Sequence, residues 1–233
     1  MHTKEPKIIV ALDHYTLDAA LECAHKLHPS LCHLKVGKGL FTNHGPIAVK
    51  KLKQLGYEIF LDLKFHDIPV QVARAAKAAA ELGVLMITVH AAGGLAMMRA
   101  AVEAVRDSKH PETKVLAVTL LTSLDAEDLR SIGVQESPLD YVLRLSALAQ
   151  QAGVTGVVSS PLELAALRQA RGEQFLLVTP GIRFDQSDSE DQKRVLGPKE
   201  ALAAGSHYLV LGRPITTAEQ PRLVLEAYLR ELS

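Results

Sequence analysis

The segment from residue 57 to residue 70, Tyr-Glu-Ile-Phe-Leu-Asp-Leu-Lys-Phe-His-Asp-Ile-Pro-Val, ends an apolar run with charged side chains. Side chains alternate between the two faces of a strand, so Asp62 and Lys64 are predicted to point to the same side. Asp67 follows where the chain has already turned, and Lys35 ends another strand-like run. Two ammonium groups and two carboxylates at strand ends predict a reaction site. The alternative interpretation is a salt bridge that ties a strand to a helix.

Polar residues also follow several of the other predicted strands. These strand ends are Asp13, His90, Thr119-Leu-Leu-Thr122-Ser, Pro180-Gly-Ile-Arg183 and Gly212-Arg213. The amino-terminal ends of the strands show no comparable cluster, and this asymmetry is typical of a barrel enzyme. Asp13 has a second interpretation as the cap of the first helix. His90 is interpreted as a packed or hydrogen-bonding histidine rather than a catalyst.

The run Gly212-Arg213-Pro214 opens the last predicted helix and has the composition of a phosphate site. Glycine lets a backbone N–H approach an anion closely, and arginine offers two parallel donors to phosphate oxygens. The loops after the seventh and eighth strands of such barrels commonly bind phosphate, and Arg183 and Gln192 lie in the first of these loops. We therefore predict a phosphate site here; the alternative for Arg213 is a solvated side chain that caps the helix.

The elements that must position these residues alternate along the chain, with short β-branched runs followed by alanine- and leucine-rich segments. Continuous apolar strands are typical of a parallel sheet covered by helices. Eight such units in 233 residues predict an α/β fold of the (β/α)8 TIM-barrel class. A doubly wound open sheet is the alternative, but it would carry a glycine-rich fingerprint after its first strand. The predicted strands are 8–12, 31–36, 58–63, 85–89, 114–119, 156–158, 175–178 and 208–211, and the predicted helices are 17–27, 45–55, 70–82, 94–107, 138–152, 161–171, 198–204 and 214–231.

No linker, repeat or low-complexity tract divides the chain, so residues 1–233 are predicted to form one barrel domain. The polar connection from about 180 to 198 is unusually long for a compact domain, and we predict that it is a lid. Four glycines lie between a helix and the next strand, where a left-handed conformation is favoured. They are Gly56, Gly83, Gly153 and Gly205.

The composition excludes several classes of protein. Lysine plus arginine equals aspartate plus glutamate at 26 each, aromatic residues are 4% and tryptophan is absent, which disfavours nucleic-acid binding. The amino-terminal apolar run is too short for a signal peptide, and nothing elsewhere resembles a membrane span. Cys23 and Cys32 have no metal-ligand spacing and are interpreted as free thiols in a reducing compartment. We predict a cytoplasmic protein.

Two histidines near the charged segment raise the question of a metal. His66, Asp67 and His90 have no recognisable ligand spacing, so the sequence predicts no metal site. His66 is interpreted as a loop residue.

Taken together, these motifs resemble the orotidine 5′-phosphate decarboxylase family, in its bacterial type, from about residue 7 to about residue 230. Asp-x-Lys-x-x-Asp alone is only moderately specific, because related phosphate-binding barrels share it, whereas the ordered set is highly specific. The set comprises Ala11-Leu-Asp13, Lys35-Val-Gly, Asp62-Leu-Lys-Phe-His-Asp67-Ile-Pro, Thr179-Pro-Gly-Ile-Arg183, Asp191-Gln192 and Gly212-Arg-Pro.

The resemblance implies decarboxylation of orotidine 5′-monophosphate to uridine 5′-monophosphate and CO₂, the last step of pyrimidine nucleotide synthesis, with no cofactor. It makes Lys64 the proton donor to C6 of the pyrimidine, with Lys35, Asp62 and Asp67 completing the charged array. It also implies a homodimer in which Asp67, followed by Ile68, is supplied by the partner subunit.

The remaining implied contacts are with the substrate. Asp13 and Lys35 match contacts to the ribose hydroxyls, and Thr122 matches a contact to the pyrimidine. Gln192, Gly212 and Arg213 match the phosphate contacts, with Arg183 at the base of the lid. One dipeptide departs from the family pattern, because Val70-Gln71 stands where the family commonly has Asn-Thr. The threonine of the family contacts the ribose, and Gln71 is long enough to reach the same group.

Two other functions are compatible with parts of the pattern. One is a sugar-phosphate lyase of the same barrel group, which typically holds Mg²⁺ with an acidic residue near the end of the second strand; Lys35 would repel the cation there. The other is a catalytically silent protein that binds a phosphate ligand. Such a protein would have no reason to keep both lysines beside two carboxylates.

Overall fold

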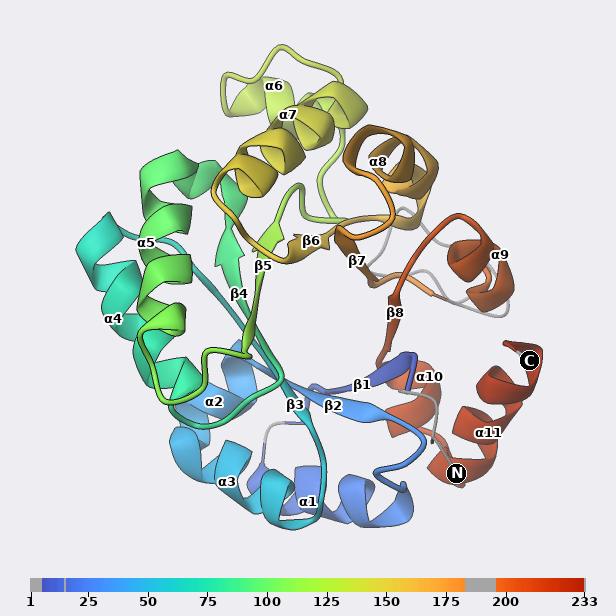
Figure 1. The fold of residues 1–233 in the computed structure, drawn as a ribbon. Coiled ribbons are helices and arrows are strands. Elements are labelled where there is room, and N and C mark those ends of the chain that lie inside the picture. The colour runs from blue at the N-terminus through green and yellow to red at the C-terminus, as the bar shows by residue number, and fades with distance from the viewer. Residues whose placement is uncertain (1–5, 15, 183–195, 233) are drawn as a thin grey trace.

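The computed structural model describes residues 6–14, 16–182 and 196–232. Within these residues, eight parallel strands close into a barrel in the order β1-β2-β3-β4-β5-β6-β7-β8, and helices surround it as a ring (Figure 1). The predicted TIM-barrel class is confirmed. The strands are β1 (Ile8–Leu12), β2 (His33–Gly37), β3 (Ile59–Phe65), β4 (Met86–His90), β5 (Lys114–Val118), β6 (Gly156–Val158), β7 (Leu176–Thr179) and β8 (Tyr208–Leu211).

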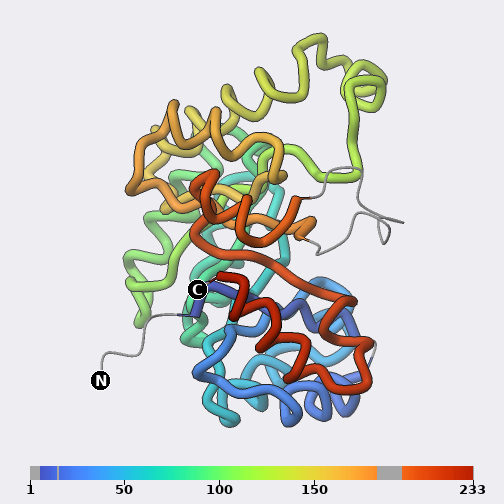
Figure 2. Tube along the Cα trace, turned by 90° about the vertical axis from the view of Figure 1, so that its right-hand side faces the viewer, coloured from blue at the N-terminus to red at the C-terminus, as the bar shows by residue number. Residues whose placement is uncertain are grey.

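The helices connect successive strands and cover the outside of the barrel. They are α1 (Leu17–Lys26), α2 (Lys38–His44), α3 (Pro46–Gln54), α4 (Pro69–Ala80), α5 (Gly94–Arg106), α6 (Ala126–Ser131), α7 (Pro138–Gln151), α8 (Leu164–Arg171), α9 (Pro198–Ala203), α10 (Arg213–Thr216) and α11 (Pro221–Glu231), with short 3₁₀ turns η1 (Ala91–Gly93) and η2 (Pro161–Glu163). The last helix, α11, contacts α1, so the two ends of the described chain close the ring (Figure 2).

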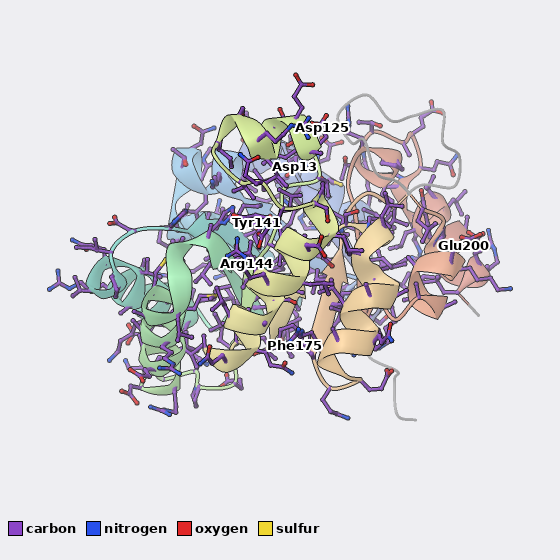
Figure 3. The ribbon with its side chains drawn as sticks, turned by 90° about the horizontal axis from the view of Figure 1, so that it is seen from above. Asp13, Asp125, Tyr141, Arg144, Phe175 and Glu200 are labelled. Atoms are coloured by element: carbon purple, nitrogen blue, oxygen red, sulfur yellow. The ribbon has the colours of Figure 1, made fainter. Side chains whose placement is uncertain are left out.

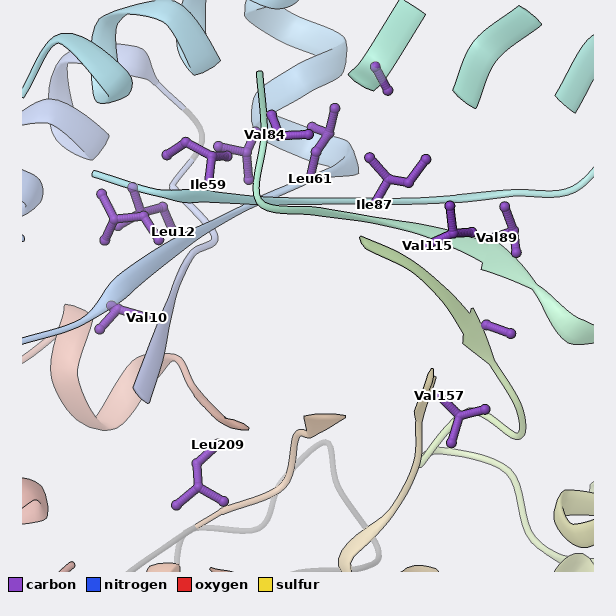
Figure 4. Packing of buried hydrophobic residues seen from close by; sticks show 14 of the residues in the cluster. Val10, Leu12, Ile59, Leu61, Val84, Ile87, Val89, Val115, Val157 and Leu209 are labelled. Atoms are coloured by element: carbon purple, nitrogen blue, oxygen red, sulfur yellow. The ribbon is translucent and has the colours of Figure 1, made fainter. Parts of the chain in front are cut away.

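Successive side chains of each strand point alternately into the barrel and toward the helices, so the hydrophobic core has two parts. Ile9 and Ala11 join a cluster inside the barrel, whereas Ile8, Val10 and Leu12 belong to a larger cluster between strands and helices. Figure 4 shows part of the larger cluster on the side of the strands that faces the helices. The inner cluster consists of Ile9, Ala11, Phe60, Met86, Leu116, Val178, Tyr208 and Val210. Three of these inner side chains, Ala11, Phe60 and Val210, also line a cavity at one end of the barrel.

Each predicted strand is present, and the largest boundary differences are at the start of β2 and the end of β3. Two short helices, α2 and α6, are additional to the prediction. The predicted helix 214–231 is divided into α10 and α11, because Pro221 has no amide hydrogen and begins a new helix at its first turn.

The four glycines that precede strands all have positive φ, as predicted. Most of the predicted lid, 180–198, cannot be compared with the structure, because residues 183–195 lie outside the described residues. On either side of this gap, Ile182 and Leu196 form a β-bridge, so the described ends of the connection lie side by side.

Candidate active site

One end of the barrel carries the polar residues that the sequence places after the strands. Asp13, after β1, and Asp125, after β5, lie at this end, whereas Phe175, before β7, lies toward the other (Figure 3). A cavity of about 400 Å³ opens here, within the usual range for small-molecule sites. It is lined by Ala11, Asp13, Lys35, Phe60, Asp62, Lys64, Val118, Leu120, Leu121, Thr122, Ser123, Val158, Ser159, Pro180, Val210, Gly212 and Arg213.

Asp62 and Lys64, which were predicted to point to the same side, are in direct contact. The Lys64 Nζ atom lies 2.8 Å from Oδ1 and 2.7 Å from Oδ2 of Asp62. Both carboxylate oxygens therefore accept from one ammonium group, which fixes the lysine head at the carboxyl end of β3 and on the cavity wall.

Lys35 joins this pair from the neighbouring strand β2. Its Nζ atom donates to Asp13 Oδ1 at 3.1 Å and lies 3.8 Å from Asp62 Oδ2. A Cβ atom on Gly37 would lie only 3.2 Å from the same Nζ, so the glycine leaves room for the ammonium group. Asp13, Lys35, Asp62 and Lys64 are thus one continuous network, which we call the charged array.

Burial and charge act in opposite directions on Asp62. Its burial disfavours the ionised carboxylate, but Lys64, Lys35 and the hydrogen bonds from Lys64 and Thr88 outweigh that penalty. The pKa of the Asp62 carboxyl is therefore held below its ordinary value. The ionised form of Asp62 is thus favoured between the side chains of Lys35 and Lys64.

Asp67 and Ile68 are not brought to the charged array of their own chain. Asp67 is exposed, and its carboxylate accepts a hydrogen bond from the Ile68 N–H at 2.6 Å. Among the described residues it forms no ion pair, and neither residue lines the cavity. Gln71 is exposed in the first turn of α4 and also does not line the cavity.

The cavity is also lined by the predicted substrate-binding residues Thr122, Gly212 and Arg213. Arg213 begins α10 directly after β8, with Gly212 as the residue before the helix. A Cβ atom on Gly212 would make only ordinary contacts with Ala11 and Asp13, so packing within the protein does not require glycine there. Arg183 and Gln192 lie outside the described residues.

His90 stacks against His66 at the end of β4, with ring centroids 5.3 Å apart. Burial and the nearby His66, Lys64 and Lys38 lower the pKa of His90 to about 4. The imidazole is neutral at pH 7, which agrees with its interpretation as a packed histidine.

Sequence reasoning missed Thr88, whose hydroxyl donates to Asp62 Oδ1 at 2.9 Å. A signal was present, because Thr88 is the polar residue within the apolar run Met86-Ile-Thr-Val. Within residues 6–14, 16–182 and 196–232, no group of three or more histidine, cysteine, aspartate or glutamate side chains could hold a metal ion. In the same part of the chain, no helix has the length and apolar character needed to cross a membrane.

A closed (β/α)8 barrel with lysines and aspartates clustered in a cavity at the carboxyl ends of its strands has the architecture of a TIM-barrel enzyme. Residues 6–228 match the Orotidine 5'-phosphate decarboxylase / HUMPS family, and the chain belongs to that family. The resemblance seen in the motifs is thereby confirmed.

Individual relatives agree with this assignment. The chain is 52% identical over 231 residues to the orotidine 5'-phosphate decarboxylase of Nitrosococcus oceani, covering 99% of each chain. The crystal structure of orotidine 5'-phosphate decarboxylase from Lactobacillus acidophilus is 40% identical, with a TM-score of 0.88 over 99% of this chain and 100% of that one. The enzyme of Methanocaldococcus jannaschii, complexed with inhibitor BMP, has the same fold at 22% identity, with a TM-score of 0.79 over 99% of this chain and 100% of that one.

Proposed function

We propose that this chain decarboxylates orotidine 5′-monophosphate to uridine 5′-monophosphate and CO₂, the last step of de novo pyrimidine nucleotide synthesis, without a metal or organic cofactor. The observation that carries the chemistry is the Lys64 ammonium, held by both oxygens of Asp62 in the cavity. The choice of substrate is supported by relatives of this name that match along almost the whole chain.

The proposed reaction needs a positive group beside the reacting carbon. Loss of CO₂ breaks the bond from C6 to the carboxyl carbon and leaves the electron pair on an sp² carbon with no ordinary electron sink. An ammonium group that is already in place stabilises this charge without reorganisation. In the proposal, Lys64 then transfers a proton to C6, which forms the C6–H bond of the product, and regains a proton from water.

Asp62 has two proposed effects on this reaction. It holds the Lys64 ammonium in place, and its buried charge lies beside the position proposed for the substrate carboxylate. Repulsion between these two negative groups would be relieved as CO₂ leaves. Lys35 extends the array toward Asp13, where both side chains are proposed to contact the ribose hydroxyls.

We also propose that Thr122 contacts the pyrimidine and that the phosphate binds at Gly212 and Arg213, which line the cavity. Arg183 and Gln192 are assigned to the phosphate from the family motifs alone. Phosphate binding is remote from C6, so its free energy can drive closure of the proposed lid and exclude water. Residues 1–233 are proposed to act as one domain.

Arg213→Ala should weaken binding of uridine 5′-monophosphate by about 10- to 100-fold, because a charge-assisted hydrogen bond to phosphate is lost. Binding of uridine, which has no phosphate, should change by less than about threefold. Titration calorimetry with both ligands measures the difference. Arg222→Ala is the matched control, because Arg222 is exposed on α11 and pairs with Glu226 away from the cavity. Equal losses for nucleotide and nucleoside would contradict a phosphate contact.

The proposed active form is a homodimer in which Asp67 and Ile68 enter the partner's cavity. Asp67 is exposed and forms no ion pair among the described residues, although it lies three positions from Lys64 in sequence. Next to it, Ile68 and Val70 are 60% and 49% exposed. Apolar side chains beside an acidic group at the edge of a site are suited to a subunit interface.

The proposed localisation is the cytoplasm, where the nucleotide substrate and reducing conditions are found. Cys23 and Cys32 are both buried free thiols, which supports this assignment. No nucleic-acid or membrane partner is proposed.

The decisive experiment follows the ultraviolet absorbance of orotidine 5′-monophosphate with purified protein, with and without EDTA. We expect loss of substrate absorbance in both samples, at the same rate. Activity that disappears with EDTA and returns with Mg²⁺ would contradict the cofactor-free reaction. No turnover of the nucleotide by folded protein would contradict the proposed function itself.

A further inference from the structure

The backbone around Lys64 departs from a regular strand. In the pairing of β3 with β4, Leu61 lies opposite Ile87 and Phe65 lies opposite Val89. Residues 62, 63 and 64 of β3 therefore lie opposite a single residue of β4, Thr88. Lys64 has φ of +52°, in the left-handed region that side chains other than glycine rarely adopt. Lys64 thus lies at an irregular position, where the regular pairing of β3 with β4 is interrupted.

The Thr88 hydroxyl forms two hydrogen bonds to β3 where the regular pairing is interrupted. It accepts a hydrogen bond from the Lys64 backbone N–H at 2.8 Å and donates one to Asp62 Oδ1 at 2.9 Å. A hydroxyl has one hydrogen to donate, so its orientation is determined: the hydrogen points to the carboxylate and a lone pair faces the N–H. Thr88 is completely buried, at 0% exposure, and does not line the cavity.

We infer that Thr88 is a positioning residue for the reaction, whose hydroxyl holds the Lys64 backbone and the Asp62 carboxylate in one geometry. This inference rests on the proposed function, in which Lys64 must lie beside C6. A buried N–H without a partner is costly, so loss of the hydroxyl should let the left-handed turn relax and carry the ammonium away from its position. Small displacements of a reacting group lower catalytic rates strongly.

The same hydrogen bond affects the charge of the array. Burial raises the pKa of Asp62, while Lys64, Lys35 and the bonds from Lys64 and Thr88 lower it. Removal of the hydroxyl takes away one of the lowering contributions, so the acidic limb of the pH profile should move to higher pH. A change that only weakens folding would not shift the pH profile of the folded enzyme.

The test compares Thr88→Val, which keeps the shape and removes the hydroxyl, with Thr88→Ser, which keeps the hydroxyl. We expect kcat of Thr88→Val to fall by about 10- to 100-fold, with KM within about threefold, because the phosphate contacts are unchanged. Thr88→Ser should regain kcat to within about fivefold of the wild type. Only Thr88→Val should show the shifted acidic limb.

Thr113→Val is the matched control. Thr113 is also a buried threonine, and its hydroxyl donates to the Val84 carbonyl at 2.8 Å, before β5 and thus at the opposite end of the barrel. The substitution removes the same group and should lower Tm while leaving kcat and its pH profile unchanged. Equal kcat values for Thr88→Val and Thr113→Val would overturn the inference.

The experiment also distinguishes a variant that does not fold from a protein that lacks the proposed activity. If Thr88→Val does not fold, Thr88→Ser is compared with Thr88→Ala, which differ only by the hydroxyl, and equal kcat values for these two would also overturn the inference. A wild-type protein without turnover would count against the proposed function, whereas an active wild type with an equally active Thr88→Val counts against Thr88 alone.

Discussion

Lys64→Ala should abolish measurable decarboxylation, with kcat lowered by about 10⁴-fold or more. The variant loses both the positive charge beside C6 and the proposed proton donor, and each of these contributions is typically worth about 10²-fold or more. Binding of uridine 5′-monophosphate should remain within about tenfold of the wild type, because the proposed phosphate and ribose contacts are made by other residues. The kcat value comes from the absorbance assay and the affinity from calorimetry.

Lys50→Ala is the control for this substitution. Lys50 is an exposed lysine on α3 that does not line the cavity, so its removal should leave kcat unchanged. Near-normal turnover by Lys64→Ala would remove Lys64 from the mechanism. A loss of turnover together with an equal loss of product affinity would indicate a collapsed site instead of a missing catalytic group.

The second large effect is recovery of activity when two inactive variants are mixed. Lys64→Ala and Asp67→Ala should each be inactive alone if the site takes Lys64 from one subunit and Asp67 from the other. In a hybrid dimer, one site has both substitutions and the other has neither. Half of the dimers in an equal random mixture are hybrids, so about a quarter of all sites should recover. The absorbance assay measures this fraction against the wild type.

Subunit exchange must be measured independently, for example by native mass spectrometry of one variant labelled with ¹⁵N. If exchange is complete and activity stays at the level of the separate variants, Asp67 acts in its own subunit's site. Mixing each variant with itself after the same treatment controls for activity recovered by refolding.

Asp62 and Lys64 meet where β3 is irregular, so the regular alternation of a strand does not account for their contact. The strands and their inward and outward faces, in contrast, could be predicted from the sequence alone. These features are local, because side-chain direction in a strand repeats every two residues. The apolar runs and the glycines before the strands were sufficient to predict the barrel, and Pro221 is a local signal for the division of the last predicted helix. The motifs were sufficient to place the chain in its family.

The residues that meet across strands could not be predicted from the sequence and are known from the fold. The contact of Lys35 with Asp13 depends on the register of β2 against β1, and the two bonds of Thr88 depend on an irregular pairing of β4 with β3. The structure also shows that Asp67 is exposed and that, among the described residues, it forms no ion pair with the array of its own chain. Such contacts join residues that are distant in sequence, and a shift of one position in register would replace each partner, so no local pattern specifies them.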